Sequence, residues 1–134
     1  MPVIKAFIVE DSPVILDSLV AMLEEMVPLK VVGTADNEAS AVSWLSDSAN
    51  LHDLVIIDIF LKRGSGLGVL KALQGARNPD RRLVVLSNYA TADIRRTCQQ
   101  LGADRVFDKS NEIDALVQYC DRLAAGHTGP GVIA

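Results

Sequence analysis

Two short segments that consist entirely of apolar residues constrain the fold of this chain more than any other feature. Residues 54–57 read Leu-Val-Ile-Ile and residues 83–86 read Leu-Val-Val-Leu, without a polar residue at alternate positions. A strand with one face in water alternates apolar and polar residues, whereas a central parallel strand is covered on both faces and is apolar throughout. The two segments therefore predict the centre of a buried parallel sheet.

Segments with helical spacing separate these runs from three further β-branched segments, which gives an alternating order of strands and helices. We expect strands at Ile4–Val9, 30–35, 54–57, 83–86 and 105–107. We expect the first helix to begin at Ser12-Pro13 and to end before Pro28, and the second to begin near Asn37. The third is expected from about Gly66 to Ala76, the fourth ends at Gly102, and the fifth covers Ile113–Gly126. Right-handed crossovers place helices on both faces of such a sheet. The chain is predicted to be an α/β protein with a doubly wound, five-stranded parallel sheet and five helices.

Apolar residues at helical spacing give each helix an expected buried stripe. The stripes are Ile15, Leu19, Met22, Leu23 and Met26 in the first helix; Ala41, Val42 and Leu45 in the second; Leu67, Leu70 and Leu73 in the third; Ile94, Cys98 and Leu101 in the fourth; and Ile113, Leu116, Val117, Cys120, Leu123 and Ala124 in the fifth. The two cysteines lack metal-ligand spacing and are predicted to be buried apolar residues. The pattern leaves open whether Trp44 packs or is exposed.

Length and charge narrow the classes of function. A chain of 134 residues is predicted to form one domain over residues 1–126, with residues 127–134 as a short mobile tail and no output domain. Thirteen Lys and Arg against 17 Asp and Glu give a net charge of −4, which argues against direct nucleic-acid binding. No apolar run approaches the roughly 18 residues of a membrane span, and no export signal begins the chain. We therefore expect a cytoplasmic protein without membrane contact.

Polar side chains follow four of the predicted strands at the point where each strand ends. They are Glu10 and Asp11, Asp58, Ser87, and Asp108 with Lys109. Because the carboxyl ends of parallel strands meet at one edge of the sheet, we expect these side chains to lie close together. Each has an ordinary explanation by itself, as an acid at a helix start, a loop aspartate or a surface lysine. Together, three carboxylates at one edge favour a divalent cation such as Mg²⁺, and a nearby aspartate could then attack a phosphoryl group.

With these residues in place, the sequence resembles the receiver domain of two-component response regulators, a flavodoxin-like domain with strand order 2-1-3-4-5. The resemblance extends from Val3 to about Ala125. It rests on four segments, which read Ile-Val-Glu-Asp-Ser at 8–12, Val-Ile-Ile-Asp at 55–58, Val-Val-Leu-Ser at 84–87 and Gly-Ala-Asp at 102–104 with the lysine at 109.

The resemblance implies a role for each site residue. Asp58 would accept a phosphoryl group from a histidine kinase or a phosphotransfer protein, while Lys109 and Ser87 would each contact a phosphoryl oxygen. The protein would then signal through protein contacts and would not be an enzyme in the usual sense. The ligands of Mg²⁺ would be Glu10, Asp11, Asp58 and the backbone carbonyl of Phe60.

Two loop positions depart from the family pattern. Lys109 is followed by Ser110, where the family commonly has proline after a cis bond; a cis bond before serine costs about 2.5–4 kcal/mol, so a trans bond and a strained cis bond both stay open. Lys62 occupies the position of a frequent proline, four residues after Asp58, and the loop there is expected to be more mobile.

A third departure concerns the switch. Val106 stands where the family usually carries a Tyr or Phe that rotates when the Ser87 hydroxyl is drawn to the phosphoryl group. Valine is stiff and short, and the neighbouring Phe107 is expected on the opposite face of the sheet. We therefore expect weak or unconventional switching, with Ser87 and the backbone before the fourth helix as the parts that could move.

Phe60 and Tyr89 each lie two residues beyond a site residue, where family members tune the access of water to the acyl phosphate. They are interpreted either as a cover that prolongs the phosphorylated state or as ordinary loop aromatics.

Several alternatives remain open at this level. The chain could be the receiver portion of a longer DNA-binding regulator, or a degenerate receiver that acts without phosphorylation. A phosphohydrolase is disfavoured because Phe60 stands where such enzymes carry a second aspartate, and a flavin protein is disfavoured by the acidic turn at Glu10 and Asp11. A downstream partner is expected on the face of the fourth helix, last strand and fifth helix, and the protein is expected to be a monomer or a weak dimer.

Overall fold

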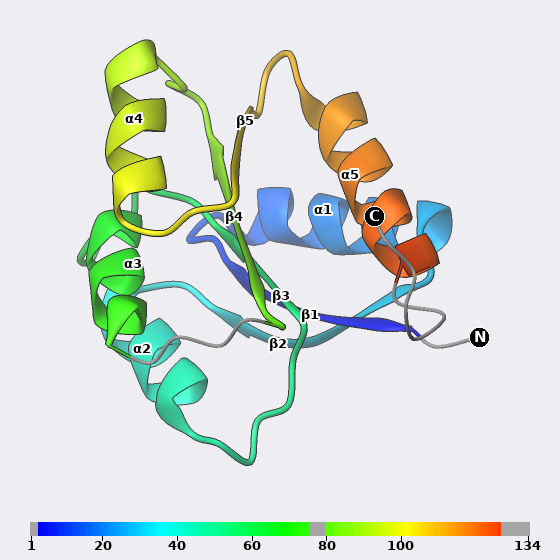
Figure 1. The fold of residues 1–134 in the computed structure, drawn as a ribbon, viewed down its shortest axis with the longest axis horizontal. Coiled ribbons are helices and arrows are strands. Elements are labelled where there is room, and N and C mark those ends of the chain that lie inside the picture. Colours follow the sequence, from blue (N-terminus) through cyan, green and yellow to red (C-terminus); the bar gives the residue numbers. More distant parts are fainter. Residues whose placement is uncertain (1–2, 76–79, 127–134) are drawn as a thin grey trace.

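The computed structural model describes residues 3–75 and 80–126, which form five strands and five helices in alternation. The elements are β1 Ile4–Val9, α1 Pro13–Met26, β2 Leu29–Ala35, α2 Glu38–Ser46, β3 Leu54–Ile57, α3 Gly66–Gln74, β4 Arg82–Ser87, α4 Ala92–Gln100, β5 Arg105–Asp108 and α5 Ile113–Gly126. The strands form one parallel sheet in the order β2-β1-β3-β4-β5 (Figure 1). The predicted fold class and strand order are confirmed.

The sheet separates two apolar cores. Helices α1 and α5 cover one face, and α2, α3 and α4 cover the other (Figure 1). All four residues of β3 are buried, and in β4 the last four residues are buried, which agrees with the apolar runs in the sequence. Burial of these strands on both faces removes apolar area from water and stabilises the fold.

The predicted element boundaries are close to those of the structure. Strands β2 and β5 are each one residue longer than predicted at one end, and β4 is one residue longer at both ends. Ser12 and Asn37 cap α1 and α2 by accepting the amides of Ile15 and Ser40. Helix α3 ends at Gln74, and its predicted end at Ala76 lies outside the described residues, as does the predicted tail at 127–134. Among the described residues, no helix is long and apolar enough to cross a membrane.

The stripe predicted for α1 is partly wrong. Leu19 and Leu23 are buried, but Ile15 is 40% exposed and Met26 is 59% exposed. Apolar residues occupy well over half the circumference of this helix, so their spacing does not select one face. The helix rests on the sheet through Leu16, Leu19, Val20 and Leu23, and the exposed pair lies at the edge of that face.

The remaining questions about packing are settled by contacts. Trp44 packs, because its ring stacks on Phe7 with centroids 4.2 Å apart and fills the space beside Gly33. Cys98 and Cys120 are free and buried, as predicted. Burial raises the pKa of Cys120 to about 12, so this thiol is inert as a nucleophile at neutral pH.

The first residue of α3, Gly66, lies directly against the end of β3. A Cβ atom at Gly66 would be 2.3 Å from the backbone oxygen of Asp58 and 2.7 Å from the Cα of Ile59. The amide of Gly66 donates to the carbonyl of Ile59 at 2.9 Å. This close approach fixes the start of α3 against the backbone of Asp58.

We expect Gly66→Ala to lower the free energy of unfolding by about 1–3 kcal/mol, since the methyl group meets backbone rather than a movable side chain. Urea denaturation measures the change. Gly75→Ala is the matched control at the other end of α3, because a Cβ there would have no atom within 4 Å; we expect it to be neutral or to stabilise by about 0.4–1 kcal/mol. Equal effects of the two substitutions would contradict this account.

Candidate functional site

The register of the sheet brings acidic residues from β1 and β3 together. Val9 is paired with Ile57, and the amide of Asp58 donates to the carbonyl of Val9 at 2.9 Å. The residues that follow this pair, Glu10 and Asp58, therefore leave adjacent strands at the same edge. Both are almost completely buried, with Glu10 3% and Asp58 7% exposed. A carboxylate that is removed from water loses its hydration, so it requires hydrogen-bond donors or positive charges in the protein.

Lys109, which follows β5, supplies the positive charge for both acids. Its Nζ lies 2.5 Å from Oε1 of Glu10 and 2.9 Å from Oδ2 of Asp58. The second oxygen of Glu10 accepts the amide of Ser12, and the second oxygen of Asp58 accepts the amide of Phe60. One ammonium group thus bridges two carboxylates, each of which is also bonded to the backbone.

These contacts set the protonation of the site. Burial raises the pKa of Asp58 above its ordinary value, although the hydrogen bond from Lys109 opposes that effect. Burial also disfavours the charged form of Lys109, but its hydrogen bonds to Glu10 and Asp58 outweigh burial, so the pKa of Lys109 lies above its ordinary value. The lysine stays protonated, and its charge favours the ionised form of Asp58.

Asp11 completes a cluster of three carboxylates. One oxygen from each of Glu10, Asp11 and Asp58 lies within 4.8 Å of the others. Asp11 is half-buried, and its Oδ2 accepts the amide of Lys62 at 2.7 Å. Three carboxylates against one lysine leave a net negative charge, and an all-oxygen donor set suits Mg²⁺. The residues present therefore fit the predicted ion; the role of the Phe60 carbonyl as a ligand stays a prediction.

Ser87 is fully buried at the end of β4. Its backbone carbonyl accepts the amide of Lys109 at 2.9 Å, which connects the ends of β4 and β5. Its Oγ accepts the amide of Tyr89 at 3.2 Å, so the hydroxyl hydrogen is not used by that bond. The side chain can therefore donate a hydrogen bond at the edge of the sheet.

Phe60 and Tyr89 are exposed, at 50% and 67%, yet they contact each other. Their ring centroids are 5.7 Å apart and the rings are perpendicular, which is a favourable edge-to-face geometry. The contact joins the loop after Asp58 to the loop after Ser87.

The three positions that depart from the family pattern lie in the loop after β3, in β5 and in the turn after β5. The described residues contain no cis peptide bond, so the bond between Lys109 and Ser110 is trans. Val106 packs in the core under α2, α3 and α4, and Phe107 packs in the opposite core, as expected from alternation along β5. The amide of Lys62 is bonded to Asp11, a bond that a proline at this position could not make.

Sequence reasoning missed one half-buried ion pair near the site, Arg95 with Glu112. Two arginines follow one another in α4, and composition does not distinguish them. The weak signal was helical geometry, because Arg95 lies about 60° from the buried Cys98 whereas Arg96 lies on the opposite side of the helix.

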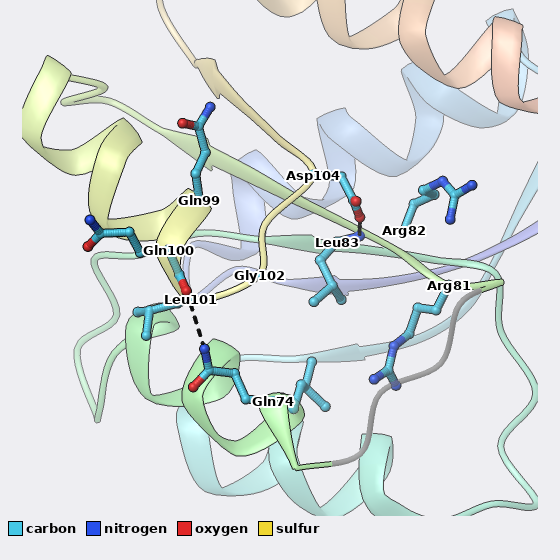
Figure 2. A pocket seen from close by; sticks show the side chains of 10 residues that line it. Gln74, Arg81, Arg82, Leu83, Gln99, Gln100, Leu101, Gly102 and Asp104 are labelled. Carbon is cyan, nitrogen blue, oxygen red and sulfur yellow. Dashed lines mark hydrogen bonds between the residues drawn. The ribbon is translucent and has the colours of Figure 1, made fainter.

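A cavity of about 810 Å³ opens beside Arg82 and Leu83 at the start of β4 (Figure 2). Ser87 is at the opposite end of this strand. Its lining is mostly polar, and Gln74 reaches the carbonyl of Gln100 across it. Its one acidic side chain, Asp104, accepts the amide of Leu83. The cavity therefore offers no group of carboxylates comparable with the cluster at the carboxyl ends of the strands.

Comparison with known proteins agrees with this geometry. The family model described as the response regulator receiver domain matches residues 6–121. The DNA-binding transcriptional activator DevR/DosR of Mycobacterium tuberculosis is 32% identical over 125 residues, which cover 93% of this chain and 56% of that protein. The chain spans a little over half the length of the curated relatives it matches first.

Solved structures share the fold. The signal receiver domain of the response regulator NarL from M. tuberculosis has a TM-score of 0.80 at 23% identity, covering 94% of this chain and 99% of that chain. A response regulator from Burkholderia pseudomallei, solved with a phosphorylated aspartic acid and a calcium ion, has a TM-score of 0.72 at 23% identity, covering 90% of this chain and 68% of that chain.

We expect Lys109→Met to lower the free energy of unfolding by about 3 kcal/mol in the absence of divalent cations, because it leaves two buried carboxylates without their shared partner. Urea denaturation at neutral pH measures the loss. Lys71→Met, which removes an exposed lysine of α3, is the matched control and should change the stability by less than about 0.5 kcal/mol. A loss below about 1 kcal/mol for Lys109→Met would contradict the role given to the bridge.

Proposed function

The chain belongs to the response regulator receiver family, and we propose that it accepts a phosphoryl group on Asp58 from a phosphohistidine of a histidine kinase or a phosphotransfer protein. The single observation that carries this proposal is the position of the Asp58 carboxylate, buried between Lys109 and two further acids at the edge of the sheet. The family match covers the segments that hold all four of these residues.

In the proposed reaction, an oxygen of Asp58 forms a bond to phosphorus while the phosphorus–nitrogen bond to the donor imidazole breaks. The attacking group must be ionised, and Lys109 favours that form through its contact with Oδ2. Lys109 then shifts from this oxygen to a phosphoryl oxygen while it keeps its bond to Glu10. Ser87, whose hydroxyl hydrogen is not used by its bond to Tyr89, donates to another phosphoryl oxygen.

Glu10, Asp11, Asp58 and the carbonyl of Phe60 would hold Mg²⁺. When bound, the ion supplies positive charge that offsets the carboxylates and the incoming phosphoryl oxygens. One carboxylate oxygen of each of Glu10, Asp11 and Asp58 accepts a hydrogen bond from a backbone amide of another residue. These bonds fix the orientation of the three side chains. Hydrogen bonds of this kind orient metal ligands before the ion arrives. The response regulator from Burkholderia pseudomallei, which shares this fold, was solved with a phosphorylated aspartic acid and a calcium ion, and this supports the proposal.

The proposal assigns output to protein contacts, on the face of α4, β5 and α5, and assigns no turnover of a separate substrate to residues 1–126. A second candidate is that these residues are the receiver of a longer DNA-binding regulator. The observation that favours it is that DevR/DosR is described as a DNA-binding activator and is matched over 56% of its length. The cytoplasmic location expected from the sequence stays a prediction.

Incubation with Mg²⁺ and acetyl phosphate should add the mass of one phosphoryl group to the protein, and Asp58→Asn should abolish this gain because it removes the nucleophile. Intact-mass spectrometry measures the adduct. Asp17→Asn removes an exposed carboxylate of α1 and is the matched control, which should be phosphorylated normally. Chelation of divalent cations with EDTA should also prevent the gain. An unmodified wild-type protein would instead favour the degenerate receiver, and an adduct on Asp58→Asn would assign the phosphate elsewhere.

We further infer that Phe60 and Tyr89 shield the phosphoryl group from water. Their edge-to-face contact closes the loops beside Asp58 and Ser87. Phe60→Ala or Tyr89→Ala should shorten the half-life of the phosphorylated protein roughly five-fold, which corresponds to about 1 kcal/mol of barrier height. The decay of the adduct after removal of the donor gives the half-life. Leu51→Ala, at an exposed apolar residue remote from β3's carboxyl end, should leave it unchanged. A longer half-life for both aromatic variants would refute shielding.

A further inference from the structure

The guanidinium of Arg95 joins three segments that carry or adjoin the phosphoryl-binding groups. Its Nε donates to the carbonyl of Ala90 at 2.9 Å, in the loop between β4 and α4. One terminal nitrogen donates to the carbonyl of Val106 in β5 at 2.8 Å, and the other to Oε1 of Glu112, just before α5, at 2.5 Å. The planar guanidinium carries its donors on three separate nitrogen atoms, and each nitrogen reaches a different acceptor.

Glu112 continues the connection to the lysine of the site. The same Oε1 that binds Arg95 accepts the amide of Asp108 at 2.9 Å, and the amide of Glu112 donates to the carbonyl of Asp108 at 2.8 Å. These bonds close the turn that carries Lys109. The hydrogen bond from Arg95 lowers the pKa of Glu112, so its carboxylate is ionised at neutral pH.

The other end of the connection is Ser87. Its Oγ accepts the amide of Tyr89, and the next residue, Ala90, presents the carbonyl that Arg95 binds. Two hydrogen bonds, joined by the backbone of Tyr89 and Ala90, therefore connect the Ser87 hydroxyl to Arg95. From there the connection passes through Glu112 to the turn of Lys109.

We propose that Arg95 is a positioning residue that couples the two phosphoryl-binding groups to α4, in the absence of an aromatic side chain at Val106. The proposal rests on the proposed function, because the movement it transmits is the shift of Ser87 and Lys109 toward a phosphoryl group. A shift of the Ser87 hydroxyl moves the amide of Tyr89 and with it the carbonyl of Ala90. Because Arg95 belongs to α4, a change in its bond to Ala90 reaches the first turns of that helix.

The coupling requires contacts of Arg95 that differ between the unphosphorylated and the phosphorylated protein. A ligand shifts a conformational equilibrium only through contacts that differ between the states. The bonds of Arg95 to Val106 and Glu112 lie on the β5 side, whereas its bond to Ala90 lies on the β4 side. Relative movement of these two sides cannot keep all three bonds at their present lengths. A short valine side chain, by contrast, has no second position to occupy.

Hydrogen–deuterium exchange of the whole chain tests the coupling, with and without Mg²⁺ and acetyl phosphate. The extent of phosphorylation is measured on the same samples by intact mass. In the wild-type protein, phosphorylation should change the exchange of residues 88–97. In Arg95→Ala, these amides should exchange about ten-fold faster before phosphorylation, and the further change on phosphorylation should be lost although the adduct forms.

Arg96→Ala is the matched control, since it removes a guanidinium from the same helix whose exposed partner is Asp93. It should respond to phosphorylation as the wild type does. Arg95→Lys keeps the charge and the stem but cannot reach three acceptors, so it should behave as Arg95→Ala does and decides the question if the alanine variant does not fold.

The outcomes separate the coupling from the function on which it rests. A wild-type protein without an adduct overturns the proposed function and with it the coupling. An adduct without any change at residues 88–97 overturns the coupling alone. A phosphorylation response of full size in a folded Arg95 variant also overturns it, and shows that Arg95 only braces the loops.

Discussion

The concentration of negative charge at one edge of the sheet is the constraint on which the rest of the structure depends. Three carboxylates converge there because Val9 and Ile57 are paired in register and the chain leaves both strands with acidic residues. The carboxylates repel one another, and this repulsion opposes the folded arrangement. The burial of the apolar residues of β3 holds the strand, and with it Asp58, in place. Lys109 offsets part of that repulsion by bridging Glu10 and Asp58, and backbone amides offset more. On the proposed function, the charge that remains attracts Mg²⁺ to this edge of the sheet.

Much of this arrangement follows from the order of elements in the sequence. The unbroken apolar runs predict the two strands β3 and β4, and the rule that parallel strands end at one edge predicts that Glu10, Asp58 and Lys109 lie together. Helix starts were predictable at Ser12 and Asn37, because a capping side chain acts on amides only a few residues away. These features depend on local periodicity or on topology, both of which are written along the chain.

Features that depend on three-dimensional contacts were not predictable in the same way. The buried face of α1 could not be chosen, since apolar residues surround most of that helix and only contact with the sheet excludes Ile15 and Met26. The packing of Trp44 depends on its contact with Phe7, which lies 37 positions earlier in the chain. Local spacing therefore did not predict it. Topology placed Lys109 beside the acids, but that one ammonium group bridges Glu10 and Asp58 depends on the reach of its side chain. The pairing of Arg95 with Glu112 likewise joins separate elements by side chains whose reach exceeds any local pattern.

The contacts that hold the site together also determine how a movement at the site is transmitted to the rest of the protein. The loops after β4 and β5 are tied directly by the bond from the Lys109 amide to the Ser87 carbonyl, and a second time through Arg95 and Glu112. The direct bond is between backbone groups at the ends of paired strands, so it resists movement of one strand against the other. The second connection runs through side chains that can rotate and through a helix that is anchored on one face only. The second connection is therefore the more flexible of the two. We expect a displacement of the site to be transmitted through Arg95 and Glu112, and to move α4, the helix that carries Arg95.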